Sequence, residues 1–226
     1  MRRALCVLAL AIVAGSSTSV IAQEKSLFDG KSLAGWKGSP EVWSVKDDAI
    51  TATVADKQLK FNTFLIWQGG DVSDFEFTCR YKMVGNNSGI QYRSKVLDAE
   101  KFICGGYQAD IDASLKYSGI NYEEKGRAIL AERGQRVTIA ADGTKNVESI
   151  GDAAELGKKI KKEDWNDYRV VAKGNHLQHY INGVLMSEVI DNQPEKAATS
   201  GVLALQAHVG PAMTVQFKDL KLKELK

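Results

Sequence analysis

The chain alternates apolar and polar residues over one ten-residue stretch, Phe75-Glu76-Phe77-Thr78-Cys79-Arg80-Tyr81-Lys82-Met83-Val84. Successive side chains of a β-strand point to opposite faces, so this pattern predicts a strand with one buried face and one solvated face. The next residues, Gly85-Asn86-Asn87-Ser88-Gly89, are typical of a turn, and Ile90 to Arg93 continues as a second strand. The stretch therefore predicts a strand, a turn and a second strand in a protein built on β-sheets.

Similar strand signals follow one another along most of the chain. They cover Val42 to Val45, Ala49 to Val54, Thr63 to Trp67, Arg136 to Ala140, Tyr168 to Lys173, His176 to Ile181, Val184 to Val189, Gly201 to Ala207 and Ala212 to Leu222. Asn182-Gly183 supplies the positive φ angles of a type I′ hairpin turn. Only Lys145 to Lys159 has helical leanings. We expect an all-β, two-sheet sandwich of jelly-roll type, with a concave face of the kind that lectin domains use.

The first 22 residues are typical of a secretory signal peptide. Arg2 and Arg3 form its positive region, the apolar run Ala4 to Ala14 follows, and Ala22-Gln23 fits a cleavage site. The apolar run is shorter than the roughly 20 residues that a membrane span needs. We expect removal of residues 1–22, secretion or periplasmic location, and a single jelly-roll domain over residues 23–226.

The balance of charge argues against nucleic acid as a partner. Without Arg2 and Arg3, the chain has 28 basic and 28 acidic residues, and we find no basic stripe of the kind that binds phosphates. Two cysteines, Cys79 and Cys104, remain after processing. In an oxidising compartment they could pair, and two buried free thiols are equally compatible with their apolar surroundings.

Polar residues gather on one side of three of the predicted strands. The strands are Asn87 to Arg93, Tyr107 to Asp112 and Leu203 to His208. Alternation places Gln108, Asp110 and Asp112 together, with Tyr107 on the opposite side; it also pairs Gln91 with Arg93 and Gln206 with His208. Carboxylates, a guanidinium, amides and an imidazole are the groups of a sugar-binding site, so we expect a carbohydrate as the partner.

Several motifs, in order, resemble those of the 3-keto-disaccharide hydrolase family. They are Leu27-Phe28-Asp29-Gly30 with Gly35-Trp36, Asn87-Ser88-Gly89-Ile90 with Tyr92-Arg93, Gly106 to Asp112, Gly119-Ile120-Asn121-Tyr122, Gly126-Arg127, Trp165-Asn166, Ile181-Asn182-Gly183 and Gly201 to His208. The resemblance runs from Ser26 to the C-terminus. It implies a jelly roll of the concanavalin and laminin-G type, secretion in bacteria, and hydrolysis or elimination of glycosides already oxidised at C3. It also implies that a divalent metal could take part.

The site candidates follow from the chemistry of a 3-keto glycoside, whose C2 proton is acidified by the neighbouring ketone. Cleavage then needs a base at C2, an electrophile for the C3 oxygen and an acid for the leaving group. We take His208 as the base, because an imidazole exchanges protons near neutral pH. Asp110 and Asp112 are candidates for acid and base roles, or for holding a divalent cation. Arg93 is the candidate electrophile, with a structural salt bridge to Asp110 as the alternative.

Other residues are candidates for binding the substrate. Gln91, Gln108 and Gln206 would orient hydroxyl groups, and Tyr122, Glu123 and Arg127 would line the rim of the cleft. His179 is a further candidate ligand, with a hydrogen-bonded histidine between the sheets as the alternative. The tryptophans Trp36, Trp43, Trp67 and Trp165 could stack on sugars, but packing in the core or at its edge is the expectation.

Two other functions remain open at this point. The first is a non-catalytic carbohydrate-binding module of the same fold, and the second is a conventional glycan hydrolase. Gln108-x-Asp110-x-Asp112 resembles the Glu-x-Asp-x-x-Glu strand of laminarinase-like glucanases. Here Gln108 stands where the nucleophilic glutamate would be, so a double-displacement mechanism lacks its nucleophile.

Overall fold

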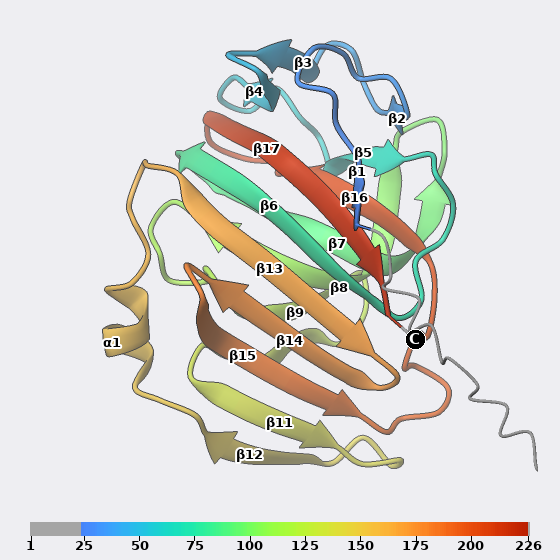
Figure 1. Cartoon of the computed structure of the whole chain (residues 1–226), viewed down its shortest axis with the longest axis vertical. Coiled ribbons are helices and arrows are strands. Elements are labelled where there is room, and N and C mark those ends of the chain that lie inside the picture. The colour runs from blue at the N-terminus through green and yellow to red at the C-terminus, as the bar shows by residue number, and fades with distance from the viewer. Residues whose placement is uncertain (1–23, 226) are drawn as a thin grey trace, which may run out of the picture.

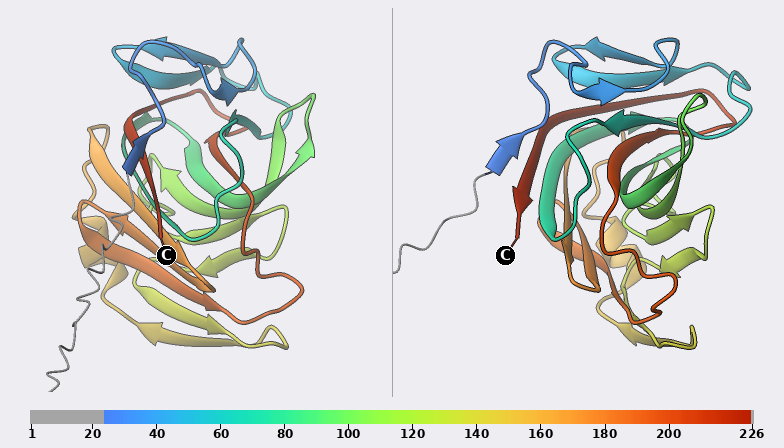
Figure 2. Two further views of the ribbon diagram at one scale, coloured as in Figure 1. Left: turned by 45° about the vertical axis from the view of Figure 1, so that its right-hand side comes forward. Right: turned by 90° about the vertical axis from the view of Figure 1, so that its right-hand side faces the viewer.

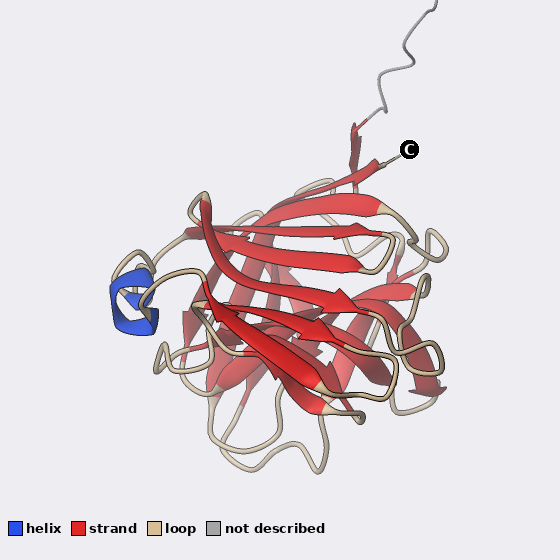
Figure 3. Cartoon of the chain, turned by 90° about the horizontal axis from the view of Figure 1, so that it is seen from below, coloured by secondary structure: helices blue, strands red, loops and turns tan. Residues whose placement is uncertain are grey.

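The computed structural model describes residues 24–225, and the predicted signal peptide and its cleavage site lie outside the described residues. Strands dominate, and the one helix of the described region, α1 (Ala153–Gly157), is a single short turn (Figure 3). The strands are β1 (Glu24–Ser26), β2 (Trp36–Lys37), β3 (Trp43–Lys46), β4 (Ala49–Val54), β5 (Thr63–Trp67), β6 (Phe75–Val84), β7 (Asn87–Asp98), β8 (Ile103–Asp112), β9 (Asn121–Glu124), β10 (Ala128–Ala131), β11 (Gln135–Ile139), β12 (Lys145–Ser149), β13 (Asn166–Lys173), β14 (His176–Ile181), β15 (Val184–Asp191), β16 (Val202–Ala207) and β17 (Met213–Glu224).

These strands form two sheets that lie face to face (Figures 1 and 2). The ten-stranded sheet has the order β12-β11-β15-β14-β13-β6-β17-β4-β3, with β1 paired to β17. The seven-stranded sheet has the order β10-β9-β8-β7-β16-β5-β2. Strands far apart in the sequence are neighbours in both sheets: β6 pairs with β17, and β7 pairs with β16. The expected all-β sandwich of two sheets is confirmed.

The two strands that the opening stretch predicts lie in different sheets. β6 belongs to the ten-stranded sheet and β7 to the seven-stranded sheet, so the turn at Gly85 and Asn86 carries the chain from one layer to the other. The apolar side of β6 is buried throughout, from Phe75 to Met83. Its Phe75 ring meets Tyr92 of β7 edge-on, with ring centroids 5.9 Å apart. The alternation is therefore confirmed, but β6 and β7 are not neighbours in one sheet.

The segment with helical leanings, Lys145 to Lys159, is divided between a strand and a short surface helix. Lys145 to Ser149 forms the exposed edge strand β12, and α1 follows, capped by the Asp152 carboxylate on the amides of Ala154 and Glu155. The Asn182-Gly183 turn joins β14 to β15 with φ angles of +50° and +78°, as a type I′ turn requires.

The two cysteines are free, and both are buried. Cys79 belongs to the core between the sheets and Cys104 to a separate cluster with Phe64, so the disulfide alternative is wrong. Three tryptophans are buried in the core, and Trp165 is half-buried under the cations of Arg80, Lys82 and Lys218. Within residues 24–225, no helix has the length and apolar character of a membrane span.

Candidate functional site

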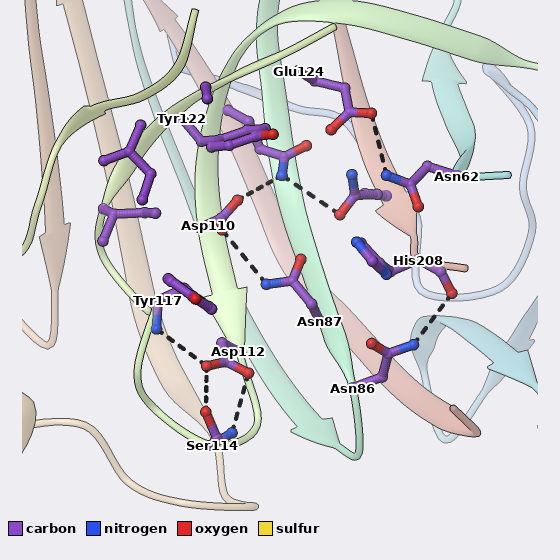
Figure 4. A pocket seen from close by; sticks show the side chains of 15 residues that line it. Asn62, Asn86, Asn87, Asp110, Asp112, Ser114, Tyr117, Tyr122, Glu124 and His208 are labelled. Atoms are coloured by element: carbon purple, nitrogen blue, oxygen red, sulfur yellow. Dashed lines mark hydrogen bonds between the residues drawn. The ribbon is translucent and has the colours of Figure 1, made fainter. Parts of the chain in front are cut away.

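A cavity of about 670 Å³ lies on the outer face of the seven-stranded sheet, the face turned away from the ten-stranded sheet. Strands β7, β8, β9, β10 and β16 and the loops beside them line it (Figure 4). The lining residues are Asn62, Asn86, Asn87, Gln108, Asp110, Asp112, Ser114, Tyr117, Ile120, Tyr122, Glu124, Ala128, Ile129, Gln206 and His208. Among these described residues there is no lysine or arginine.

The middle strand β8 supplies the floor. Gln108, Asp110 and Asp112 face the cavity, whereas Tyr107 and Ile111 belong to the core between the sheets. This is the division that strand alternation predicts. In Figure 4, Asp110 lies below Tyr122, with Asn87 to its lower right.

Asp110 is only 6% exposed, and burial is the main reason that its pKa is raised to about 7. The nearby carboxylates of Glu124 and Asp112 raise the pKa further. Two amides oppose this effect: Gln108 Nε2 donates to Asp110 Oδ1 at 2.5 Å, and Asn87 Nδ2 donates to Asp110 Oδ2 at 3.5 Å. Near neutral pH, Asp110 can therefore give a proton as well as take one.

A chain of hydrogen bonds orients the amides beside Asp110. Ser94 Oγ donates to Gln91 Oε1 at 2.5 Å, and Gln91 Nε2 donates to Gln108 Oε1 at 3.0 Å. Because the Gln108 oxygen accepts this bond, its NH₂ group points the other way, where it donates to Asp110 and, at 3.5 Å, to Gln206 Oε1. A Cβ at Gly89 would come within 2.6 Å of the Gln108 side chain, so glycine is needed there. Gln91 supports the site and does not line the cavity.

The chain of hydrogen bonds that begins at Ser94 ends at Gln206, whose side-chain donor is unpaired. Gln206 is fully buried and lines the cavity, and within the described part of the protein its Nε2 has no hydrogen-bond partner. Leaving a buried donor unsatisfied costs about 1–3 kcal/mol. Gln206 Nε2 is thus prepared to donate to an oxygen of a bound molecule.

Asp112 lines the cavity but is engaged by its own loop. Its Oδ2 accepts from Ser114 Oγ at 2.5 Å and from the Tyr117 amide at 3.1 Å, and its Oδ1 accepts from the Ser114 amide at 3.2 Å. This carboxylate therefore fixes the loop between β8 and β9. Nowhere in residues 24–225 are three His, Cys, Asp or Glu side chains gathered as metal ligands. Asp110 and Asp112 do not form a ready carboxylate pair for a cation.

His208 follows β16 and points its ring into the cavity (Figure 4). Its Nδ1 lies 2.5 Å from the carbonyl oxygen of Val209. A carbonyl can only accept, so Nδ1 carries the hydrogen of this bond and Nε2 of the neutral ring has a free lone pair. The geometry gives His208 the tautomer that a base needs.

Arg93 does not lie with Gln91, and the expectation that they share a face is wrong. A β-bulge places Arg93 and Ser94 opposite the single residue Gly106, and Arg93 takes a positive φ of 45°. The bulge turns the arginine away from the cavity. Its buried guanidinium donates to the carbonyls of Ser73, Gly174 and Ala198 and pairs with Asp74 at 2.9 Å. Arg93 therefore has a structural role: it joins the segments around Asp74, Gly174 and Ala198. The alternative of a salt bridge to Asp110 is also wrong.

His179 lies between the sheets, as the structural alternative for it predicted. Its Nδ1 donates to the Ile120 carbonyl at 3.0 Å, and its Nε2 lies 2.9 Å from the Tyr92 hydroxyl, which also accepts from Asn121 Nδ2. Burial lowers the pKa of His179 to about 4, so the ring is neutral. It does not reach the cavity.

Of the three residues expected at the rim, only Tyr122 lines the cavity. Glu123 and Arg127 point away from it and form an ion pair at 2.6 Å. Arg127 also binds Asp191 of β15 at 2.7 Å, and Asp191 accepts from the Tyr107 hydroxyl. This network ties the β9–β10 hairpin to the ten-stranded sheet.

Sequence reasoning missed several lining residues. Glu124 is 7% exposed and accepts from Asn62 Nδ2 at 3.2 Å. The pairing of β9 with β8 places Tyr122 opposite Gln108 and Glu124 opposite Gly106, so the two side chains share the outer face. Alternation would have found Glu124 if Asn121 to Glu124 had been taken as a strand instead of a loop. Nothing in the sequence pattern points to Asn62, which comes from a distant loop.

Comparison with solved structures shows which known proteins share the fold. A protein from Parabacteroides distasonis, provisionally described as a glycosyl hydrolase, matches at a TM-score of 0.60 and 21% identity, over 90% of this chain and 100% of that one. Carbohydrate-binding module CBM66 from Bacillus subtilis matches at 0.56 and 16%, over 84% and 96%. The laminarinase catalytic domain of Thermotoga maritima matches at 0.52 and 9%, over 91% and 98%. At these identities the likeness shows a shared fold.

Sequence comparison gives the family. No curated protein is significantly similar to the chain. The profile of one domain family, however, matches residues 23–223, which is nearly the whole length. The protein belongs to the family of 3-keto-alpha-glucoside-1,2-lyase-like domains.

Proposed function

We propose that this protein is an exported enzyme that cleaves 3-keto glycosides by elimination between C1 and C2, with water then adding to the product. The observation that carries the proposal is that one cavity combines three groups. They are the His208 imidazole with a free lone pair on Nε2, the buried Asp110 carboxyl with a pKa of about 7, and the unpaired amide donor of Gln206. Family membership supports the same chemistry.

His208 acts as the base in this proposal. Its Nε2 takes the proton from C2, and the electrons of that C–H bond move toward the C3 ketone to form an enediolate. The Val209 carbonyl, hydrogen-bonded to Nδ1, stabilises the positive ring that results. The Asn86 side chain, which donates to the backbone carbonyls of His208 and Val209, holds this turn in place.

Amide donors take the place that sequence reasoning gave to Arg93. Negative charge grows on the C3 oxygen as the enediolate forms, and Gln206 Nε2 is free to donate to it. When the enediolate collapses, the C3 carbonyl is restored, a C1–C2 double bond forms and the bond from C1 to the aglycone oxygen breaks. Asp110, protonated in part near pH 7, gives its proton to that oxygen.

The test compares 3-keto-glucosides with the unoxidised parent glucosides. We expect release of the aglycone from the keto form alone. The reaction should be slower when C2 carries deuterium, because the C2–H bond breaks in the rate-determining step. Cleavage of the parents, or no isotope effect under single-turnover conditions, would contradict elimination. Binding of the keto glycoside without turnover would instead favour a carbohydrate-binding module.

A further inference from the structure

We propose that the cavity selects 3-keto glycosides with an apolar, ring-bearing aglycone, such as aryl and arylalkyl glycosides, through a wall formed by Tyr117, Ile120, Tyr122, Ala128 and Ile129, here called the apolar wall. This inference rests on the proposed function, because it assigns the part of the cavity that the reacting sugar does not need. The polar groups that act on the sugar ring all lie on the other side of Asp110.

The apolar wall contains a hydrophobic side chain, Ile129, that the free protein leaves only half-buried. Ile120 is 1% exposed and Ile129 is half-buried, yet neither belongs to the core between the sheets or to the smaller cluster around Phe64. Their neighbours Leu130 and Ala131 do pack into the core. Both side chains line the cavity, but Ile120 is already buried. The half-buried Ile129 is the one that would lose further contact with water against a bound apolar group.

Sheet order separates this wall from the polar groups. The apolar wall comes from β9, β10 and the loop before β9, whereas Asn87, Gln206 and His208 come from or follow β7 and β16, on the other side of β8. In Figure 4, Tyr122 lies above Asp110 and Tyr117 to its lower left, whereas His208 and Asn62 lie to its right. A sugar placed between Gln206 and Asp110 directs its leaving group toward the apolar wall.

The chemistry of the wall favours an apolar ring over a second sugar. Isoleucine and alanine offer no hydrogen bonds, so hydroxyl groups placed against them would lose water without replacement. Tyr122 and Tyr117 give ring faces on which an aromatic group can stack. The Arg127 network holds the hairpin that carries Ala128 and Ile129, so this surface is fixed before the ligand arrives.

The experiment compares benzyl and methyl 3-keto-glucosides, which share the sugar and an alcohol leaving group but differ in apolar surface. We expect kcat/KM to favour the benzyl compound by roughly tenfold in the intact protein. Ile129→Ser should reduce this preference to about twofold while cleavage of the methyl compound persists, which also reports that the variant is folded. Val147→Ser, which changes a 51% exposed side chain on β12 outside the cavity, is the matched control and should keep the full preference.

The outcomes separate this inference from the proposed function. Cleavage of both compounds at equal efficiency, or an unchanged preference in Ile129→Ser, overturns the apolar wall and leaves the catalytic proposal standing. If neither compound is cleaved, the catalytic proposal fails, and binding of the same pair is measured by calorimetry. Tighter binding of the benzyl compound then supports the wall, and equal affinities overturn it.

Discussion

The two faces of the seven-stranded sheet are in contact with similar residue types in different states. The inner face packs against His179 of β14 in the ten-stranded sheet, which is hydrogen-bonded through both nitrogens, and on the same side Tyr107 and Arg127 share Asp191. On the outer face, His208 keeps a lone pair and Gln206 has a donor without a partner in the described protein. The inner face uses polar groups to join the sheets, and the outer face leaves them available.

This difference shows that the residue type alone does not identify a functional group. A buried group that is fully hydrogen-bonded stabilises one arrangement of the fold, while a buried group that lacks a partner costs free energy until a ligand supplies one. Asp110 accepts from two amides, but burial outweighs these hydrogen bonds and raises its pKa to about 7, so this carboxyl is also available for proton transfer. Substitutions on the two faces should therefore have opposite effects on activity and stability.

The largest effect on activity is expected when the two histidines are replaced one at a time. His208→Gln removes the proposed base and should lower kcat on 3-keto-glucosides by about 10²- to 10⁴-fold, with little change in melting temperature. His179→Gln should do the reverse, because it disturbs the buried bonds to Tyr92 and Ile120 and leaves the cavity residues in place. Steady-state kinetics and thermal unfolding of both variants check this. Equal activity of His208→Gln and the unmodified protein would remove His208 from the mechanism.

The next effect concerns the unpaired amide. Gln206→Met keeps the size of the side chain but removes the donor proposed for the C3 oxygen, so kcat should fall by roughly 10²-fold. The melting temperature should not fall, because an unsatisfied buried donor is lost with it. The matched control is Gln178→Met on the ten-stranded sheet, where the amide donates to Glu188. A variant that is less stable and still active would show that Gln206 is structural.

The inner face is tested by the ion pairs of Arg127. Arg127→Met leaves the buried carboxylate of Asp191 without its partner and should cost about 3 kcal/mol, or roughly 6–12 °C in melting temperature. Arg169→Met is the control, because its ion pair with Glu76 is partly exposed and should contribute less than about 1 kcal/mol. Circular dichroism melts of the two variants give the comparison. Equal losses would mean that the network around Asp191 does not tie the sheets together.

The sequence predicted the fold and the central strand of the site because both rest on alternation. Gln108, Asp110 and Asp112 face the cavity as expected, and Tyr107 faces the core. Alternation failed at Arg93, where a bulge changes the side to which the residue points. The bulge shifts the alternation by one residue, but Arg93, Ser94 and Lys95 are all polar, so the sequence contains no sign of the shift.

Other parts of the site depend on tertiary contacts that no local pattern encodes. Asp112 could not be distinguished from Asp110 in the sequence, and only the Ser114 and Tyr117 loop shows that its oxygens are already engaged. Glu124 and Asn62 are joined by a hydrogen bond although they are 62 residues apart in the chain. Sequence reasoning located the polar face correctly, but hydrogen bonding in the folded protein decides which of its groups are available.

The smallest expected effect is a dependence of stability on pH that Asp110 imposes. Its pKa is about 7 in the folded protein against an ordinary value of 3.8, so between these pH values the folded state holds a proton that the unfolded state has released. Stability contributed by this group is therefore present below about pH 4 and is lost as pH rises through 7. Asp110→Asn removes the loss, so the variant should match the unmodified protein near pH 4 and melt a few degrees higher near pH 8. Asp98→Asn, at an exposed carboxylate whose pKa is lowered by Lys101, should give the opposite trend. Parallel melting curves for Asp110→Asn and the unmodified protein across this range would mean that Asp110 is ionised at little cost, and the acid role would then pass to another group.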